Sequence, residues 1–244
     1  MKIATISTIV AIAACLSVGV GAASYVSPPG TIQAGTNYFS LPAIANPGDA
    51  PTVFAGIPIA GKLFYWCRMT QHWLVYPDDW GGVNAVVPWH MGLRLDADQP
   101  YTISLQGNQP TSEKNTCLNP LVAGYACISQ PYNWESAWSA FKFSLDKIPG
   151  VRYSTAEAVA LGWIEDYLIE GAQDSGTRIT LDGAGGTSTT VKPWKAYWVQ
   201  TKIAPSVGKL TIYWPTAPVP EPTGLLVLGL GIAGLSRVGR KRTM

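Results

Sequence analysis

The six residues from Gly229 to Gly234 read GLGIAG, the G-x-G-x-x-G spacing that cradles a dinucleotide pyrophosphate. Such a loop works only where it joins a buried strand to a helix, with an acidic residue about 20 positions further on. Only ten residues follow Gly234, and no Asp or Glu follows Glu221. We therefore expect no dinucleotide site here, and the glycines need another explanation.

Residues that catalyse hydrolysis or acyl transfer are few in this chain. His72 and His90 are the only histidines, and no serine lies in a G-x-S-x-G motif. Three pairs of neighbouring acids could form a hydrolase dyad or bind calcium, but acids at such spacing are common in turns, where they bond the backbone. We therefore predict no catalytic residue and no enzyme, and we keep a secreted hydrolase as the second alternative. The acid pairs are Asp78 with Asp79, Asp96 with Asp98, and Glu165 with Asp166.

Tryptophan is the residue type best suited to form a binding surface. The chain has ten tryptophans, and their flat faces can stack on sugar rings. Trp66, Trp73, Trp80 and Trp89 are close together in the sequence and are the candidate glycan-binding residues. Tryptophan is also a large core residue, and the recurrence of Pro-Trp at residues 88–89 and 193–194 favours a packing role. Both interpretations, a carbohydrate-binding module and structural packing, stay open.

Both ends of the chain carry targeting features. Met1–Lys2 is a short basic start, residues 3–20 are apolar, and Gly21-Ala22-Ala23 supplies small residues for cleavage. This order predicts a signal peptide over residues 1–23. The segment Ile12-Ala13-Ala14-Cys15 also resembles a lipoprotein box, which would place a lipid on Cys15. Either alternative exports the protein.

The C-terminal 29 residues, 216–244, combine prolines, an uncharged run and a basic end. The run, residues 224–236, would extend about 20 Å as a helix, which is short of the roughly 30 Å hydrocarbon core of a bilayer. We expect a marginal membrane helix here. The cations behind it, Arg237, Arg240, Lys241 and Arg242, would stay on the cytoplasmic side and leave the preceding chain outside.

The triplet Pro220-Glu221-Pro222, followed by this run and this basic cluster, resembles the PEP-CTERM sorting signal of exported bacterial proteins. The resemblance covers about 26 residues and implies that the inner membrane holds the tail briefly. It also implies processing near Pro220 to Pro222 by an exosortase, followed by release to the cell envelope or the exterior. Association with exopolysaccharide or biofilm is a further implication of the resemblance. An ordinary C-terminal anchor that is not removed is the alternative.

The body of the chain, residues 24–215 between the two terminal segments, differs in charge from the whole chain. Five of the 17 Lys and Arg and one of the 15 acids lie in the terminal segments, which leaves 12 cations and 14 acids, or about −2. A nucleic-acid partner would require a basic stripe in the folded part, so we expect none. Frequent Gly, Pro, Trp, Tyr, Thr and Val favour short strands joined by turns.

An internal repeat divides the body into two halves, residues 24–110 and 111–215. Residues 34–42, AGTNYFSLP, align without gaps with residues 123–131, AGYACISQP. The Pro-Trp pairs and the strand-like runs 101–105 and 210–214 follow in the same order. We predict an all-β, antiparallel, sandwich-like fold built from two related halves.

The expected elements are mostly strands. Ser154 with Glu157 forms a capping box, which predicts a short helix over about 155–161. Residues 131–138 could form another helical turn with Trp134 and Trp138 on one face. The expected strands are 36–41, 63–68, 73–76, 91–96, 101–106, 125–129, 140–145, 164–169, 177–181, 195–202 and 209–214.

Cys67, Cys117 and Cys127 follow the signal segment. No C-x-x-C or H-x-x-x-H spacing is present, so we predict no metal site and no cofactor. In an oxidising compartment, Cys117 and Cys127 are close enough in sequence to form a disulfide. Cys67 would then be a buried small residue or a free thiol.

These observations lead to one functional expectation and two alternatives. We expect an exported, non-enzymatic protein of the cell surface or extracellular matrix. A carbohydrate-binding module is the first alternative, and the secreted hydrolase is the second.

Overall fold

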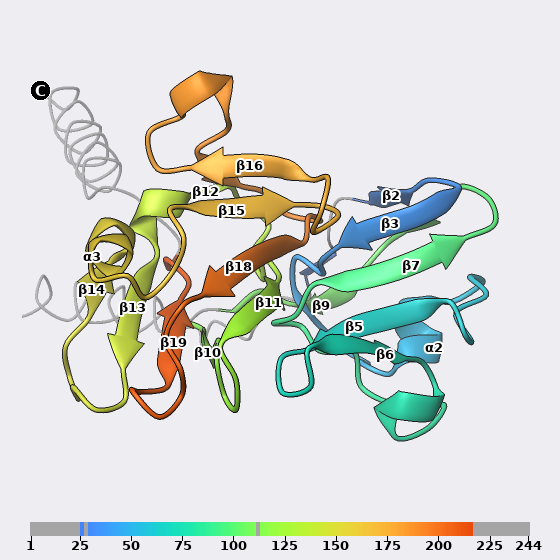
Figure 1. Ribbon diagram of the computed structural model, residues 1–244. Coiled ribbons are helices and arrows are strands. Elements are labelled where there is room, and N and C mark those ends of the chain that lie inside the picture. The colour runs from blue at the N-terminus through green and yellow to red at the C-terminus, as the bar shows by residue number, and fades with distance from the viewer. Residues whose placement is uncertain (1–24, 27–28, 111–112, 217–244) are drawn as a thin grey trace, which may run out of the picture.

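The computed structural model describes residues 25–26, 29–110 and 113–216. This part of the chain consists mostly of short strands in antiparallel sheets, with few helices (Figure 1). The all-β prediction is confirmed at this level. The predicted signal segment, the predicted membrane helix and the sorting residues lie outside the described residues.

The first part of the chain forms one four-stranded sheet and two smaller ones. The four-stranded sheet has the order β3-β7-β5-β6, and beside it lie β2-β8 and β1-β9-β4. The elements are β1 (Tyr25–Val26), β2 (Gly30–Ile32), β3 (Gly35–Phe39), β4 (Ile44–Ala45), α2 (Ala50–Val53), β5 (Leu63–Cys67), β6 (His72–Val75), η1 (Asp78–Trp80), β7 (Leu93–Ala97), β8 (Tyr101–Ile103) and β9 (Gln106–Asn108).

The second part forms two four-stranded sheets and one strand pair. Their orders are β11-β18-β15-β16, β10-β19-β13-β14 and β12-β17. The elements are β10 (Asn115–Cys117), β11 (Gly124–Ile128), β12 (Ser136–Ala137), η2 (Trp138–Ala140), β13 (Lys142–Leu145), β14 (Tyr153–Ser154), α3 (Thr155–Ala160), β15 (Tyr167–Glu170), β16 (Thr177–Thr180), η3 (Ala184–Gly186), β17 (Thr190–Val191), β18 (Tyr197–Thr201) and β19 (Leu210–Tyr213).

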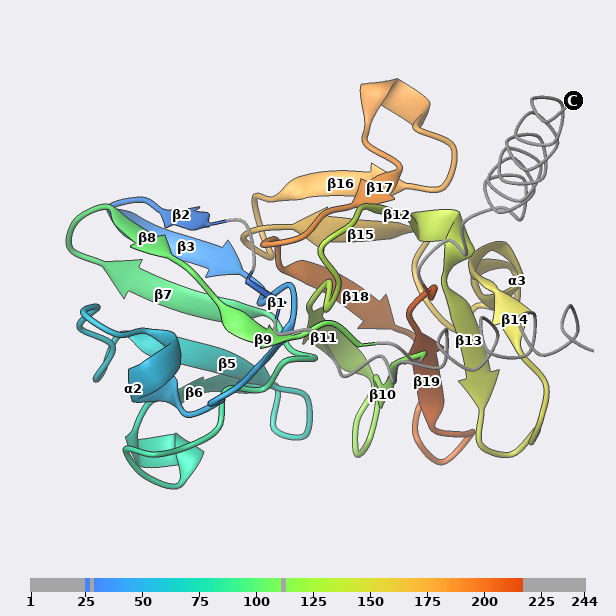
Figure 2. The same cartoon turned by 180° about the vertical axis from the view of Figure 1, so that it is seen from behind.

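The sheets β3-β7-β5-β6 and β11-β18-β15-β16 share one topology. In each, the first strand pairs with the fourth in chain order, and the second and third follow. Gly35 and Gly124 begin the two first strands, and both have positive φ (97° and 148°). Figures 1 and 2 show the two sheets side by side.

Each part has its own apolar core, because one face of each large sheet is covered. In the first part the core contains Leu93 and Leu95 of β7, which alternate with the half-buried Arg94. In the second part the core joins side chains from both four-stranded sheets, such as Leu168 of β15 and Phe143 of β13. This alternation of buried and exposed positions is the period of a strand with one covered face.

Most of the expected elements are present. A described strand falls within or overlaps every expected strand range, and α3 begins at the expected capping box, with Ser154 Oγ accepting from the Glu157 amide at 3.3 Å. The helical turn expected over residues 131–138 is wrong. Ser136 and Ala137 form a strand with β17, and Trp138 starts a 3-10 turn instead. The short strands β1, β2, β4, β10, β12, β14 and β17 were not expected.

The two parts pack tightly against each other at Gly92. A Cβ at this position would lie 2.3 Å from Cys127 Sγ and 2.8 Å from Ala196 Cβ. Gly92→Ala should therefore lower the free energy of unfolding by roughly 1 to 3 kcal/mol through overpacking, measured by urea denaturation. Adding Cys127→Ala should recover part of this loss, because it removes the nearer atom. Strictly additive effects of the two substitutions would contradict the contact.

Candidate functional site

The junction between the two parts is built around β11. One edge of β11 pairs with β18, and the other edge faces the first part of the chain. There, Met91 forms an antiparallel bridge with Ile128, and the Gly92 amide donates to the Cys127 carbonyl at 3.1 Å. The backbone of β11 is thus held from both sides.

Side chains complete this second edge where no strand reaches it. The Gln71 amide accepts from the Tyr125 N–H at 2.8 Å and donates to the Tyr125 carbonyl at 3.0 Å. Trp66 Nε1 donates to the same carbonyl at 2.8 Å. Gln71 therefore makes the pair of hydrogen bonds that a neighbouring strand would make, and it adopts a left-handed backbone conformation (φ 56°) to do so.

Three tryptophans pack edge to face at this junction. The ring of Trp66 lies 5.6 Å from that of Trp73 and 5.1 Å from that of Trp198, and the last two are 5.5 Å apart. Tyr38 contacts Trp73, and Tyr125 contacts Trp198. Edge-to-face contacts stabilise such pairs beyond the contribution of their buried area. The cluster therefore stabilises the packing of β5 and β6 against β18.

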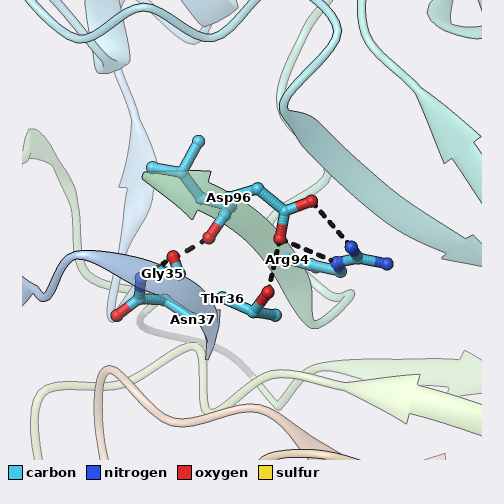
Figure 3. A network of polar contacts seen from close by, with 6 residues as sticks. Gly35, Thr36, Asn37, Arg94 and Asp96 are labelled. Atoms are coloured by element: carbon cyan, nitrogen blue, oxygen red, sulfur yellow. Dashed lines mark hydrogen bonds and ion pairs between the residues drawn. The ribbon is translucent and has the colours of Figure 1, made fainter. Parts of the chain in front are cut away.

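Next to this cluster, the outer face of the first sheet carries a polar network (Figure 3). Arg94 donates to both carboxylate oxygens of Asp96, at 3.1 and 2.6 Å, and Thr36 Oγ1 donates to Asp96 at 2.8 Å. The Arg94 guanidinium also lies 4.8 Å above the Phe64 ring centroid. A bidentate pair of this kind fixes the orientation of both side chains.

The four candidate tryptophans do not form one surface. Trp66 is buried and Trp73 is half-buried at the junction. Trp80 packs against the core of the first part, beside Tyr65, and donates its N–H to the Leu74 carbonyl at 3.0 Å. Trp89 contacts His90 and Trp214. Of the four, Trp66 and Trp73, which pair across β5 and β6, lie on the same outer face as the Figure 3 network, and Trp73 is the less buried of the two.

The expected disulfide between Cys117 and Cys127 is not formed in the structure, where both cysteines and Cys67 are free. Closeness in sequence does not bring the pair together, because Cys117 belongs to β10 and Cys127 to β11, in different sheets. Cys127 is instead buried against Gly92 and Trp198. Burial raises the pKa of the Cys127 thiol, which keeps it protonated and unreactive.

The acid pairs make local contacts rather than a shared cleft. Asp79 accepts from the Val75 amide at 2.9 Å, and Asp98 accepts from the Tyr101 hydroxyl at 2.6 Å. Glu165 lies 3.1 Å from the Lys202 ammonium, while Asp166 is exposed. The described residues contain no cluster of three or more His, Cys, Asp or Glu side chains suited to a metal ion.

His90 and His72 have different surroundings. His72 is exposed at the start of β6, and its Nδ1 lies 3.3 Å from the Thr70 carbonyl. His90 is half-buried against Trp89. Burial, assisted by the nearby Arg68 guanidinium, lowers the pKa of His90 from 6.5 to about 4.

Two features of the junction were missed by reasoning from sequence: Trp198 and Gln71. A signal for Trp198 existed, because residues 196–199, AYWV, are continuously apolar, a pattern typical of a strand buried on both faces. Gln71 carries no such signal, because its role depends on which strand lies opposite.

Comparisons with protein-family models, with curated proteins and with solved structures found no match to this chain. Within residues 25–26, 29–110 and 113–216, no helix has the length and hydropathy that crossing a bilayer requires.

The low pKa of His90 predicts a pH-dependent stability. The folded protein binds the proton only near pH 4, whereas the unfolded chain binds it near 6.5. The free energy of unfolding should therefore be highest above pH 6.5 and should fall by about 3 kcal/mol on acidification to pH 4. His90→Gln should flatten this part of the curve, measured by urea denaturation between pH 4 and 8. His72→Gln is the control, and an equal flattening by both variants would contradict the assignment.

Proposed function

We propose that this chain is an exported, non-enzymatic protein of the cell surface or extracellular matrix, processed through a PEP-CTERM-like signal and associated with exopolysaccharide. One observation carries the proposal beyond the sequence. Trp214, which directly follows β19, is held by two hydrogen bonds, because its backbone N–H donates to the Lys114 carbonyl at 3.0 Å and its indole N–H donates to the Ser129 carbonyl at 2.8 Å. Cleavage near Pro220 would therefore remove none of the described strands.

The body of this protein, in our proposal, is sandwich-like and consists of two related halves, residues 24–110 and 111–215. The shared order of the sheets β3-β7-β5-β6 and β11-β18-β15-β16 supports this. So does the placement of the repeated Ala-Gly motif, because its glycines, Gly35 and Gly124, begin equivalent strands. The junction around β11, which we also call the seam, then joins two copies of one unit.

The sorting route follows from the resemblance of the tail. The inner membrane would hold residues 224–236, with the cations Arg237, Arg240, Lys241 and Arg242 on the cytoplasmic side. An exosortase would act near Pro220-Glu221-Pro222 and release the body to the envelope or the exterior. The non-enzymatic assignment is supported by Asp96 and Glu165, whose carboxylates pair with Arg94 and Lys202.

Replacing the triplet tests the route. In cells of the producing organism, the variant carrying Pro220→Ala, Glu221→Ala and Pro222→Ala should keep its tail and stay in the inner-membrane fraction. The unmodified protein should lose both terminal segments and leave that fraction. Intact mass spectrometry of each cell fraction measures both cleavages together.

Pro218→Ala, two residues before the triplet, serves as the matched control and should be processed normally. Recovery of the unmodified protein from the cytosol, with both termini intact, would contradict export. Equal processing of the triplet variant would contradict the role of Pro220 to Pro222.

A carbohydrate-binding module is the second candidate, because one face combines aromatic and polar side chains. Tyr38, Phe64 and Trp73 share the outer face of the first sheet with the Arg94–Asp96 pair. Aromatic planes beside fixed hydrogen-bonding groups are the usual composition of a ligand site. In this candidate the glycan contacts the outer face of the first sheet beside the seam. It does not contact all four of the tryptophans that the sequence suggested.

A single substitution on that face tests the second candidate. Tyr38→Ala should weaken binding of the producing cell's exopolysaccharide by about tenfold, the loss expected for one aromatic contact. Retardation in polysaccharide-containing gels and titration calorimetry measure the change. Tyr101→Ala, on β8 and outside the face, is the control. Equal binding by both variants would argue against this face.

A further inference from the structure

Exposed aliphatic side chains concentrate at one end of the molecule. Four turns, β5–β6, β10–β11, β13–β14 and β18–β19, lie along the lower side in both Figure 1 and Figure 2. Of the ten large apolar side chains exposed in the described part, six belong to these turns. They are Met69 (53%), Leu121 (65%), Val122 (37%), Ile148 (37%), Val151 (42%) and Val207 (55%). We call residues 68–71, 118–123, 146–152 and 202–209 the loop end.

Hydrogen bonds connect the four turns into one surface. Arg68 donates to Thr116 Oγ1 at 2.8 Å and to the Cys117 carbonyl, which joins the first turn to the second. The buried Asn119 side chain donates to the Ile203 and Gly208 carbonyls at 3.0 and 3.1 Å, which joins the second to the fourth.

The third turn is tied to the fourth in the same way. The Lys209 amide donates to Asp146 Oδ1 at 2.9 Å, and the Lys147 ammonium donates to the Ser206 carbonyl. The exposed aliphatic residues are therefore displayed by turns whose backbones are fixed, not by independent loops.

The loop end is cationic, whereas the body as a whole is not. It holds Arg68, Lys147, Arg152, Lys202 and Lys209 against Asp146 alone. Glu113 and Glu165 pair with Arg152 and Lys202 from outside it, and counting them still leaves a net charge of +2. The body carries 12 cations and 14 acids, so the sign of the charge reverses at this end.

A hollow of about 300 Å³ opens within the β13–β14 turn. It is lined by the exposed Ile148 and Val151 and by Arg152, Asp146 and Tyr213. The Arg152 guanidinium lies 4.2 Å from the Tyr213 ring centroid, which holds the cation beside the hollow. Arg152, which also pairs with Glu113, therefore lines the same hollow as the two aliphatic side chains.

We propose that the loop end binds the surface of a lipid membrane with anionic headgroups. The exposed aliphatic side chains enter the boundary between headgroups and acyl chains, and the neighbouring cations contact the headgroups. Surfaces that combine apolar tips with Lys and Arg bind anionic membranes by adding these two contributions. Val83 and Val86 are also exposed, but their segment follows the acidic pair Asp78 and Asp79, and the hydrogen bonds that connect the four turns do not include it.

This contact is separate from the predicted tail anchor. The four turns belong to the folded body, whereas the predicted anchor is residues 224–236. The loop end goes beyond the proposed sorting route, because it stays with the body after the tail is removed.

Hydrogen–deuterium exchange on the full chain tests the proposal turn by turn. Addition of preformed phosphatidylglycerol vesicles should slow exchange at the four turns by about tenfold or more, as their tips leave water. Phosphatidylcholine vesicles should have little effect there. Because exchange is resolved along the sequence, insertion of residues 224–236 is read separately from binding by the turns.

Two substitutions at the tips provide the matched comparison. Leu121→Asp with Val207→Asp should abolish the vesicle-dependent protection without changing the thermal unfolding midpoint. Leu161→Asp, at a residue 52% exposed after α3 and away from this end, should leave the protection unchanged.

Three outcomes would overturn the proposal. Protection confined to residues 224–236 would show that the tail alone binds lipid. Equal protection by phosphatidylcholine would remove the role of the cations. Protection without vesicles, together with a dimer mass by light scattering, would make the loop end an interface between copies of this chain.

Discussion

The pairing of the second edge of β11 is the constraint on which the junction depends. A strand buried between two parts of a fold must satisfy its backbone groups on both sides. Here Met91 and Gly92 pair with one half of the edge, and Gln71 and Trp66 bond the other half at Tyr125. Glycine is required at position 92 because the Cys127 and Ala196 side chains leave no room for a Cβ there, and Gln71 has a left-handed backbone conformation where it bonds Tyr125.

The same constraint explains why tryptophans that could bind a ligand are used for packing instead. A buried tryptophan needs an acceptor for its indole N–H. Trp66, Trp198 and Trp214 donate to the carbonyls of Tyr125, Gly171 and Ser129, each in another segment of the chain. Their rings are therefore held in the interior. A surface for sugars would have to come from residues beside the seam, where Tyr38 and Trp73 are half-buried.

Local features could be predicted from the sequence, whereas pairings between distant segments could not. The strands follow from alternation and turn residues, and α3 follows from the contact of Ser154 with Glu157, three residues apart. The helical turn at 131–138 fails because Ser136 pairs with Val191, a partner that local propensity does not reveal. The predicted disulfide between Cys117 and Cys127 is absent for the same reason, because their separation in sequence does not indicate which sheet each cysteine belongs to. The seam itself depends on contacts between the parts and had no local signal beyond the apolar run around Trp198.

Closing the seam also decides which surfaces are left for partners. On the outer face of the first sheet, Trp66 and Trp73 contact the second part at the junction, and Thr36, Arg94 and Asp96 form the polar remainder of that face. The turns at the loop end are fixed by bonds that begin next to the seam, at Arg68, and continue through Asn119. Because the Arg68 bonds cross from the first part to the second, a movement at the seam would also displace the first turn relative to the other three. The four turns therefore form one surface only while the seam keeps its geometry, and the tryptophan cluster packs across that seam.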